Sequence, residues 1–125
     1  MKILIVDDSV LDRKLLIRTL MKAEITQEIL QAEDGEKALE VLAHNYRDIC
    51  LILLDWQMPK MSGIEMMTGL VSVPVLSSIP VIMVTASGSD ENKKQAYDVN
   101  PNLAGYVVKP YKPEQLLEAV KPHLK

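Results

Sequence analysis

Ile3-Leu4-Ile5-Val6-Asp7-Asp8-Ser9 is the stretch that determines the predicted fold, because four large apolar residues run directly into two carboxylates. Apolar runs that do not alternate with polar residues are typical of strands covered on both faces of a parallel sheet. Comparable runs occupy residues 49–54, 81–84 and 106–108, and a weaker one occupies residues 28–32. The sequence therefore predicts five strands, of which residues 3–6 form the first.

Segments with helical periodicity separate these strands. Their apolar stripes are Leu11, Leu15, Leu16 and Leu20 in the first; Ala38, Leu39, Val41 and Leu42 in the second; Tyr97 and Val99 in the fourth; and Leu116, Leu117 and Val120 in the last. The spacing of Ser9 to Asp12 and of Ser62 to Glu65 is that of a capping box, which predicts two helix starts. We expect the third helix to stop near Val71 and a loop to lead from there into the fourth strand.

Strands that alternate with helices predict an α/β fold. Such a chain forms a doubly wound parallel sheet with right-handed crossovers and helices on both faces. The 125 residues suit one domain, and 48% apolar with 25% charged residues is the balance of a globular protein. We therefore expect residues 1–125 to form a single stand-alone domain.

Charge and composition argue against several classes of protein. The net charge is −3 and no large basic patch is present, which argues against direct nucleic-acid binding. The single cysteine, Cys50, excludes an internal disulfide and fits a reducing compartment. No apolar run approaches the roughly 18 residues of a membrane span, and the residues after Met1 lack signal-peptide features. We expect a cytoplasmic protein that does not bind membranes.

Polar residues gather at the ends of four predicted strands. Asp7 and Asp8 follow the first strand, Asp55 follows the third, Thr85 ends the fourth and Lys109 ends the fifth. Singly, each has an ordinary explanation, since an aspartate can cap a helix, threonine favours strands and a lysine can belong to a turn. Because the carboxyl ends of parallel strands share one edge, where open α/β sheets bind ligands, their coincidence predicts a functional site.

The three aspartates predict a metal site. Two carboxylates 4 Å apart repel by roughly 4 kcal/mol at an effective dielectric of 20, so such a cluster holds a proton or binds a cation. Carboxylate oxygens suit Mg²⁺, which also binds phosphate oxygens, and Mn²⁺ is an acceptable substitute. A carboxylate can attack a phosphoryl group, whose oxygens Lys109 and Thr85 can then bind.

The whole sequence resembles the receiver domains of response regulators. Besides the opening stretch, the resemblance is carried by Leu54-Asp55-Trp56-Gln57-Met58-Pro59 with Ser62-Gly63, by Val84-Thr85-Ala86, and by Gly105-Tyr106-Val107-Val108-Lys109-Pro110. The Trp and the Tyr-Val-Val-Lys-Pro stretch are most similar to chemotaxis-type single-domain receivers. The resemblance implies a flavodoxin-like (βα)5 fold with a five-stranded parallel sheet in the order 2-1-3-4-5.

The resemblance also implies a phosphoacceptor in two-component signalling rather than an enzyme. Asp55 matches the aspartate that accepts a phosphoryl group from a histidine kinase or phosphotransfer domain. Asp8 matches the direct Mg²⁺ ligand and Asp7 the ligand that acts largely through water. Gln57 stands where the family uses a backbone carbonyl as a metal ligand.

A conformational switch is implied by the same resemblance. Thr85 matches the hydroxyl that moves towards the phosphoryl group, and Lys109 matches the lysine that pairs with it. Tyr106 matches the aromatic residue that turns inward when Thr85 moves. This movement couples the site to the face formed by the fourth helix, fifth strand and fifth helix, where a downstream target is expected to bind. A phosphatase is a further expected type of partner.

Two positions depart from the chemotaxis-type pattern. Gln57 stands where such receivers often carry Asn, and Ser87 stands where they often carry an acidic residue. In the family these side chains flank the path of the water that hydrolyses the acyl phosphate. We therefore expect the lifetime of the phosphorylated form to differ from that of better-known relatives.

Three other functions fit the sequence less well than this one. A phosphohydrolase with an aspartate nucleophile would carry Asp-x-Asp after the first strand, whereas Asp7 and Asp8 are adjacent. A flavodoxin-like or dinucleotide-binding protein would carry a phosphate loop rich in Gly, Ser or Thr at that place. A scaffold that takes up no phosphoryl group need not keep all five site residues, and only a phosphorylation assay separates it from a working receiver.

Overall fold

Five strands form one parallel sheet in the computed structural model, which describes residues 1–124. The strands are Lys2–Val6 (β1), Glu28–Ala32 (β2), Ile49–Leu54 (β3), Val81–Thr85 (β4) and Gly105–Val108 (β5). Their order is β2-β1-β3-β4-β5, and all neighbours pair in parallel. The predicted fold class and strand order are confirmed.

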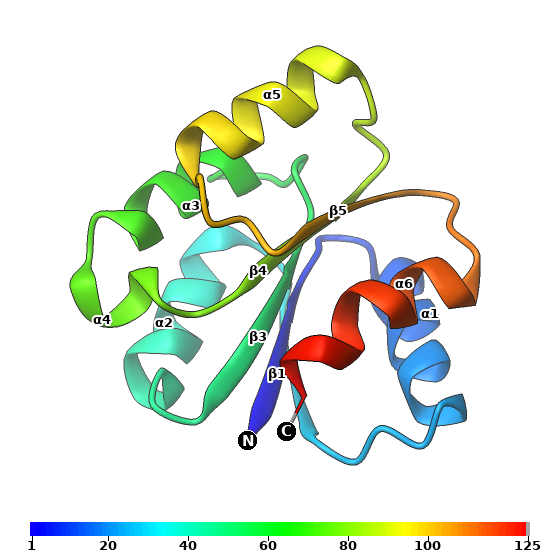
Figure 1. The fold of residues 1–125 in the computed structure, drawn as a ribbon. Helices are drawn as coiled ribbons and strands as arrows, with labels where there is room; N and C mark the ends of the chain where they lie inside the picture. The colour runs from blue at the N-terminus through cyan, green and yellow to red at the C-terminus, as the bar shows by residue number, and fades with distance from the viewer. Residues whose placement is uncertain (125) are drawn as a thin grey trace.

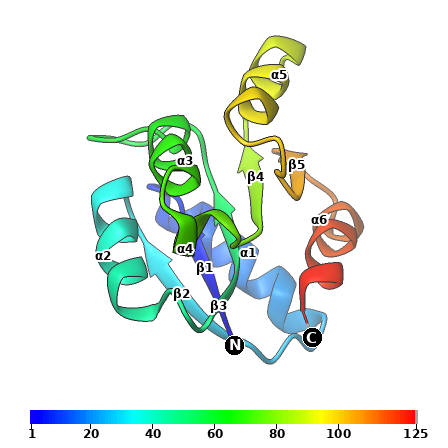
Figure 2. The same ribbon diagram turned by 60° about the vertical axis from the view of Figure 1, so that its left-hand side comes forward.

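Helices cover both faces of the sheet (Figures 1 and 2). One layer holds α1 (Val10–Lys22) and α6 (Pro113–Val120), and the other holds α2 (Gly35–Asn45), α3 (Gly63–Val71) and α5 (Asp90–Val99). Alternate residues of the fully buried strand β3 serve the two layers, since Ile52 packs with α2 and α3 while Leu53 packs with α1 and α6. Burial on both faces is the reason that this strand has no polar residue.

One element differs from the sequence prediction. After α3 ends at Val71, as expected, residues Pro74–Ser77 form a one-turn helix (α4) instead of a loop. Its turn is closed by hydrogen bonds from the backbone N–H groups of Leu76 and Ser77 to the carbonyl of Val73. Pro74 suits this place because its fixed φ is already helical and its missing N–H is not needed in a first turn.

Side-chain caps fix the starts of α1 and α3, which follow the loops at the carboxyl edge of the sheet. Ser62 and Glu65 form the complete capping box that their spacing predicts, at the start of α3. Ser9 caps α1 by accepting from the N–H of Asp12, but the carboxylate of Asp12 does not accept a hydrogen bond from the backbone N–H of Ser9 in return.

Within residues 1–124, no helix is both long enough and apolar enough to cross a bilayer.

Candidate functional site

Backbone hydrogen bonds fix Asp7 and Asp55 side by side. The N–H of Asp7 donates to the carbonyl of Ala32 at 3.1 Å, and that of Asp55 donates to the carbonyl of Val6 at 2.9 Å. The strand pairing thus continues one residue beyond β1 and β3, which are neighbours in the sheet. As a result two aspartates, only 1% and 8% exposed, meet at the carboxyl edge of the sheet.

Asp8 joins these two residues to form a three-carboxylate cluster. Each of Asp7, Asp8 and Asp55 offers an oxygen atom, and the three oxygens lie within 4.8 Å of one another. Asp8 is exposed whereas the other two are buried. An all-oxygen donor set with one side open to water fits a hard divalent cation such as Mg²⁺, which retains several waters.

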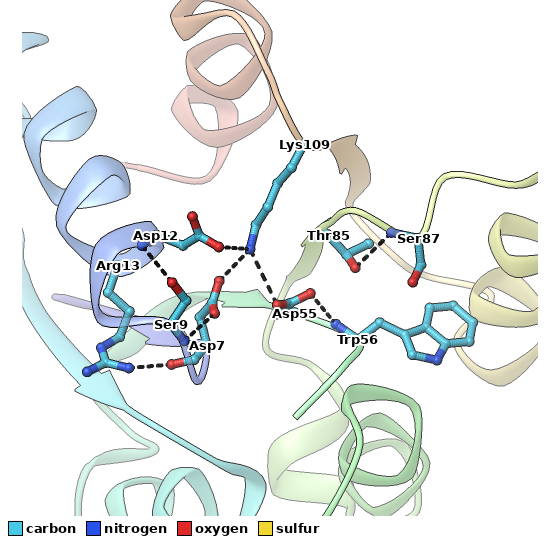
Figure 3. A network of polar contacts seen from close by, with 9 residues as sticks. All are labelled: Asp7, Ser9, Asp12, Arg13, Asp55, Trp56, Thr85, Ser87 and Lys109. Atoms are coloured by element: carbon cyan, nitrogen blue, oxygen red, sulfur yellow. Dashed lines mark hydrogen bonds and ion pairs between the residues drawn. The ribbon is translucent and has the colours of Figure 1, made fainter. Parts of the chain in front are cut away.

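Lys109 lies at the centre of the site (Figure 3). Its ammonium donates to Asp7 Oδ2 at 2.6 Å, to Asp12 Oδ2 at 2.9 Å and to Asp55 Oδ2 at 3.3 Å. The cis peptide bond between Lys109 and Pro110 follows β5, where the N–H of Lys109 donates to the carbonyl of Thr85 at 2.8 Å. The lysine predicted from the sequence therefore bridges α1, β1 and β3.

The charges perturb both partners of the shortest pair. Burial acts to lower the pKa of Lys109, but the hydrogen bonds that it donates to Asp7 and Asp12, with the charge of Asp55, outweigh this effect and raise that pKa. Burial raises the pKa of Asp7, and the nearby charge of Asp55 adds to this effect. The hydrogen bonds from Lys109 and from the N–H of Ser9 oppose the rise without cancelling it. Lys109 thus stays protonated, whereas burial disfavours the ionised form of Asp7.

The second oxygen of Asp55 is oriented by its own loop. Oδ1 accepts from the N–H of Trp56 at 2.7 Å, and the carbonyl of Trp56 accepts from the N–H of Gly63 at 2.8 Å. A Cβ at position 63 would lie 2.1 Å from the carbonyl oxygen of Asp55. Glycine is required there because the start of α3 passes against the backbone of Asp55.

A hydrogen-bonded chain links Thr85 to Tyr106. The buried Thr85 hydroxyl accepts from the N–H of Ser87 at 3.2 Å, and the hydroxyl of Tyr106 donates to the carbonyl of Ser87. Burial raises the pKa of Tyr106, and the charge of Asp55 raises it further. The backbone of Ser87 therefore connects β4 with β5, a link that sequence reasoning did not foresee.

Asp12 is the site residue that the sequence did not reveal. The Ser9–Asp12 spacing predicts a capping box, but the Asp12 carboxylate turns into the site and contacts Lys109. The available signal was its position four residues after Asp8, which places it in the first turn of the helix that follows the paired aspartates. Nearby, the guanidinium of Arg13 donates to the carbonyl of Asp7 and to Gln31 Oε1, and so joins α1 to the ends of β1 and β2.

The remaining predicted residues surround this centre. Gln57 is exposed on the loop that follows Asp55, Ser87 is half-buried beyond Thr85, and Trp56 is half-buried beside Asp55. The metal-binding role of the Gln57 carbonyl, and the effect of both side chains on phosphate lifetime, stay predictions.

Comparisons with known proteins agree with this geometry. The family described as the response regulator receiver domain matches residues 3–121. A chemotaxis protein CheY homolog of Campylobacter jejuni is 33% identical over 121 residues, which are 97% of this chain and 90% of that protein. The phosphate regulon transcriptional regulatory protein PhoB of Pseudomonas aeruginosa is 38% identical over 119 residues, covering 95% of this chain and 49% of that protein.

Among solved structures, the chemotaxis protein CheY4 of Vibrio cholerae has a TM-score of 0.84 and 32% sequence identity, with 98% of both chains covered. The similarity in fold and in sequence therefore extends over nearly the whole chain. Since the family match alone covers nearly the whole chain, this protein belongs to the family of response regulator receiver domains.

Proposed function

We propose that Asp55 accepts a phosphoryl group from the phosphohistidine of a histidine kinase or phosphotransfer domain, in a reaction that depends on Mg²⁺. The observation that carries the proposal is the placing of Asp55. Its buried carboxylate lies 3.3 Å from the Lys109 ammonium and within 4.8 Å of two further carboxylates. A carboxylate between a fixed cation and an oxygen-rich cation site is suited to receive a phosphoryl group.

The proposed reaction exchanges one bond for another. A carboxylate oxygen of Asp55 attacks the phosphorus, the new P–O bond forms, and the P–N bond to the donor imidazole breaks with its electron pair going to the imidazole nitrogen. Lys109 supplies a positive charge to the phosphoryl oxygens, and Thr85 supplies a hydroxyl donor from β4. These groups are positioned before the reaction by their backbone bonds to neighbouring strands.

Asp7, Asp8 and Asp55 are the residues that would hold Mg²⁺, with Mn²⁺ as a substitute. When bound, Mg²⁺ offsets the negative charge of the carboxylates and of the phosphoryl oxygens. Asp7 and Asp55 are buried, whereas the exposed Asp8 leaves that side open to water.

The output of the switch is proposed to be a change in partner binding on the face formed by α5, β5 and α6. These elements are the fourth helix, fifth strand and fifth helix of the sequence prediction, since the short α4 adds one to the helix numbering. The Thr85–Ser87–Tyr106 chain leads from the acceptor to this face. A hollow of about 730 Å³ lies there, lined by Tyr106 and Lys109 together with residues of α5 and α6. A protein target fits an open surface of this kind, and a phosphatase is a further proposed partner.

Relatives named for chemotaxis support chemotaxis as the pathway, with the flagellar motor switch as a candidate target in the cytoplasm. PhoB, by contrast, is named as a transcriptional regulatory protein. The pathway proposal therefore needs its own test, which is a pull-down of the motor switch with phosphorylated and unphosphorylated protein. Equal binding of the two forms would remove it.

The first test of the proposal uses the fluorescence of Trp56, whose backbone N–H donates to Asp55 Oδ1. Mg²⁺ should change the fluorescence, and acetyl phosphate should change it a second time. Asp55→Asn should remain folded and lose the second change together with all covalent phosphate labelling. Labelling that persists in Asp55→Asn would contradict the assignment, and a wild-type protein that binds Mg²⁺ but takes up no phosphoryl group from any donor would be a scaffold.

A further inference from the structure

We propose that Asp12 is a positioning residue that competes with the phosphoryl group on Asp55 for the ammonium of Lys109. The inference rests on the function proposed above and goes beyond it. It assigns to the first turn of α1 a direct influence on how strongly the protein favours its phosphorylated form.

The distances place Asp12 among the partners of Lys109. Its Oδ2 lies 2.9 Å from Lys109 Nζ, closer than Asp55 Oδ2 at 3.3 Å. Asp12 is not part of the three-carboxylate cluster, and its side chain is 40% exposed whereas that of Lys109 is 15% exposed. Its backbone is fixed in α1, where its N–H donates to the Ser9 hydroxyl at 3.1 Å. The carboxylate therefore reaches the site from outside the metal cluster.

The number of donors limits how many anionic groups Lys109 can bind at once. An ammonium has three N–H groups, and in this structure three carboxylates accept from that of Lys109. A phosphoryl oxygen can accept from Lys109 only if one of these bonds weakens.

The three carboxylates differ in what the reaction does to them. Asp55 loses its carboxylate charge when its oxygen is phosphorylated to form the acyl phosphate, and Asp7 belongs to the proposed cation site. Asp12 alone keeps both its charge and its access to Lys109. In addition, its negative charge repels the phosphoryl oxygens, so competition and repulsion act in the same direction.

The test measures the concentration of acetyl phosphate that phosphorylates half of the protein at steady state, at saturating Mg²⁺. Asp12→Asn should lower this concentration about two- to fivefold, the size expected for one partly exposed ion pair. Asp12→Glu, which restores the charge, should bring the value back towards that of the wild type. If Asp12 served only to stabilise α1, its substitution would change the midpoint of thermal unfolding and leave this concentration unchanged.

Two matched variants separate contact with Lys109 from a general loss of charge. Glu33→Gln removes one negative charge from an exposed position just after β2, at the same edge of the sheet, and should have no comparable effect. In a Lys109→Ala background, Asp12→Asn should lose most of its effect, because the two residues are then no longer coupled. An equal effect of Glu33→Gln, or an undiminished effect without Lys109, would overturn the proposal.

A measurement on the metal-free, unphosphorylated protein examines the contact itself. The Lys109 ammonium should give a ¹H–¹⁵N resonance protected from water, and Asp12→Asn should accelerate its exchange. Unchanged exchange would overturn the proposed contact. Failure of wild-type protein to accept phosphate would instead refute the proposed function, whereas wild-type labelling with no Asp12 effect would refute this inference alone.

Discussion

Burial, together with the charge of Asp55, raises the pKa of Asp7 above its ordinary value of 3.8. A raised pKa means that the metal-free folded protein binds a proton where the unfolded chain does not. Stability without metal should therefore fall as the pH rises through the pKa of Asp7, and it should recover as the pH falls.

Mg²⁺ binding should show the opposite dependence on pH, because the metal requires the ionised carboxylate. As the pH is lowered, we expect the Mg²⁺ affinity to begin to fall while the pH is still above 3.8. Titrations with Mg²⁺ at several pH values, followed by Trp56 fluorescence, would measure this affinity. Asp7→Asn should bind Mg²⁺ more weakly and lose this part of the pH dependence. An affinity that stays constant down to pH 3.8 would show that Asp7 is not a metal ligand.

At the scale of single residues, the sequence predicted which groups meet but not how they share partners. Asp7, Asp55 and Lys109 could be placed because each stands at a strand end, and parallel strands bring such ends together. The ion pair of Asp12 with Lys109 could not be placed, because it depends on the direction in which α1 leaves the sheet. The nearby Ser9 also offered a sufficient local explanation for an acidic residue at that position.

Two glycines of α3 show how one element supports the loop of Asp55. A Cβ at Gly63 would lie 2.1 Å from the Asp55 carbonyl oxygen, whereas a Cβ at Gly69 would meet no atom within 4 Å. Gly69→Ala should stabilise the protein by about 0.5–1 kcal/mol, because alanine favours a helix. Gly63→Ala should destabilise it by about 1–3 kcal/mol through overpacking and should displace the Asp55 loop.

Urea unfolding of the two variants, followed by acetyl phosphate labelling, would measure both effects. Gly69→Ala should be labelled like the wild type, while Gly63→Ala should be labelled more slowly. Stabilisation of both variants would mean that the loop can move away from α3 without harm to the site.

Element boundaries followed from the sequence where a side chain signalled them. Ser62 and Glu65 predicted the start of α3, because the side chain of each accepts a hydrogen bond from the backbone N–H of the other. The short helix α4 was missed because Pro74 can either end a helix or begin one, and only the path of the chain after Val71 decides between the two.

At the scale of the whole molecule, the strand order could be predicted because the apolar runs and the strand-end residues recur in a fixed sequence. The two hydrophobic layers follow from the same pattern, since β3 is buried on both faces and must be covered twice. The geometry between the layers could not be predicted, because it depends on how particular side chains interlock across the sheet.

The two layers are expected to unfold together, because β1, β3 and β4 each contribute buried residues to both. Leu16 lies in the α1–α6 layer and Met67 in the other, and both are at most 1% exposed. Leu16→Ala and Met67→Ala should each reduce the free energy of unfolding by about 2–5 kcal/mol, whereas Leu11→Ala, at a position 77% exposed, should change it by less than about 0.5 kcal/mol. Each variant should retain a single urea transition by both Trp56 fluorescence and circular dichroism, as one cooperative domain requires. If Leu16→Ala separated the two transitions while Met67→Ala did not, the α1–α6 layer would be a unit of its own.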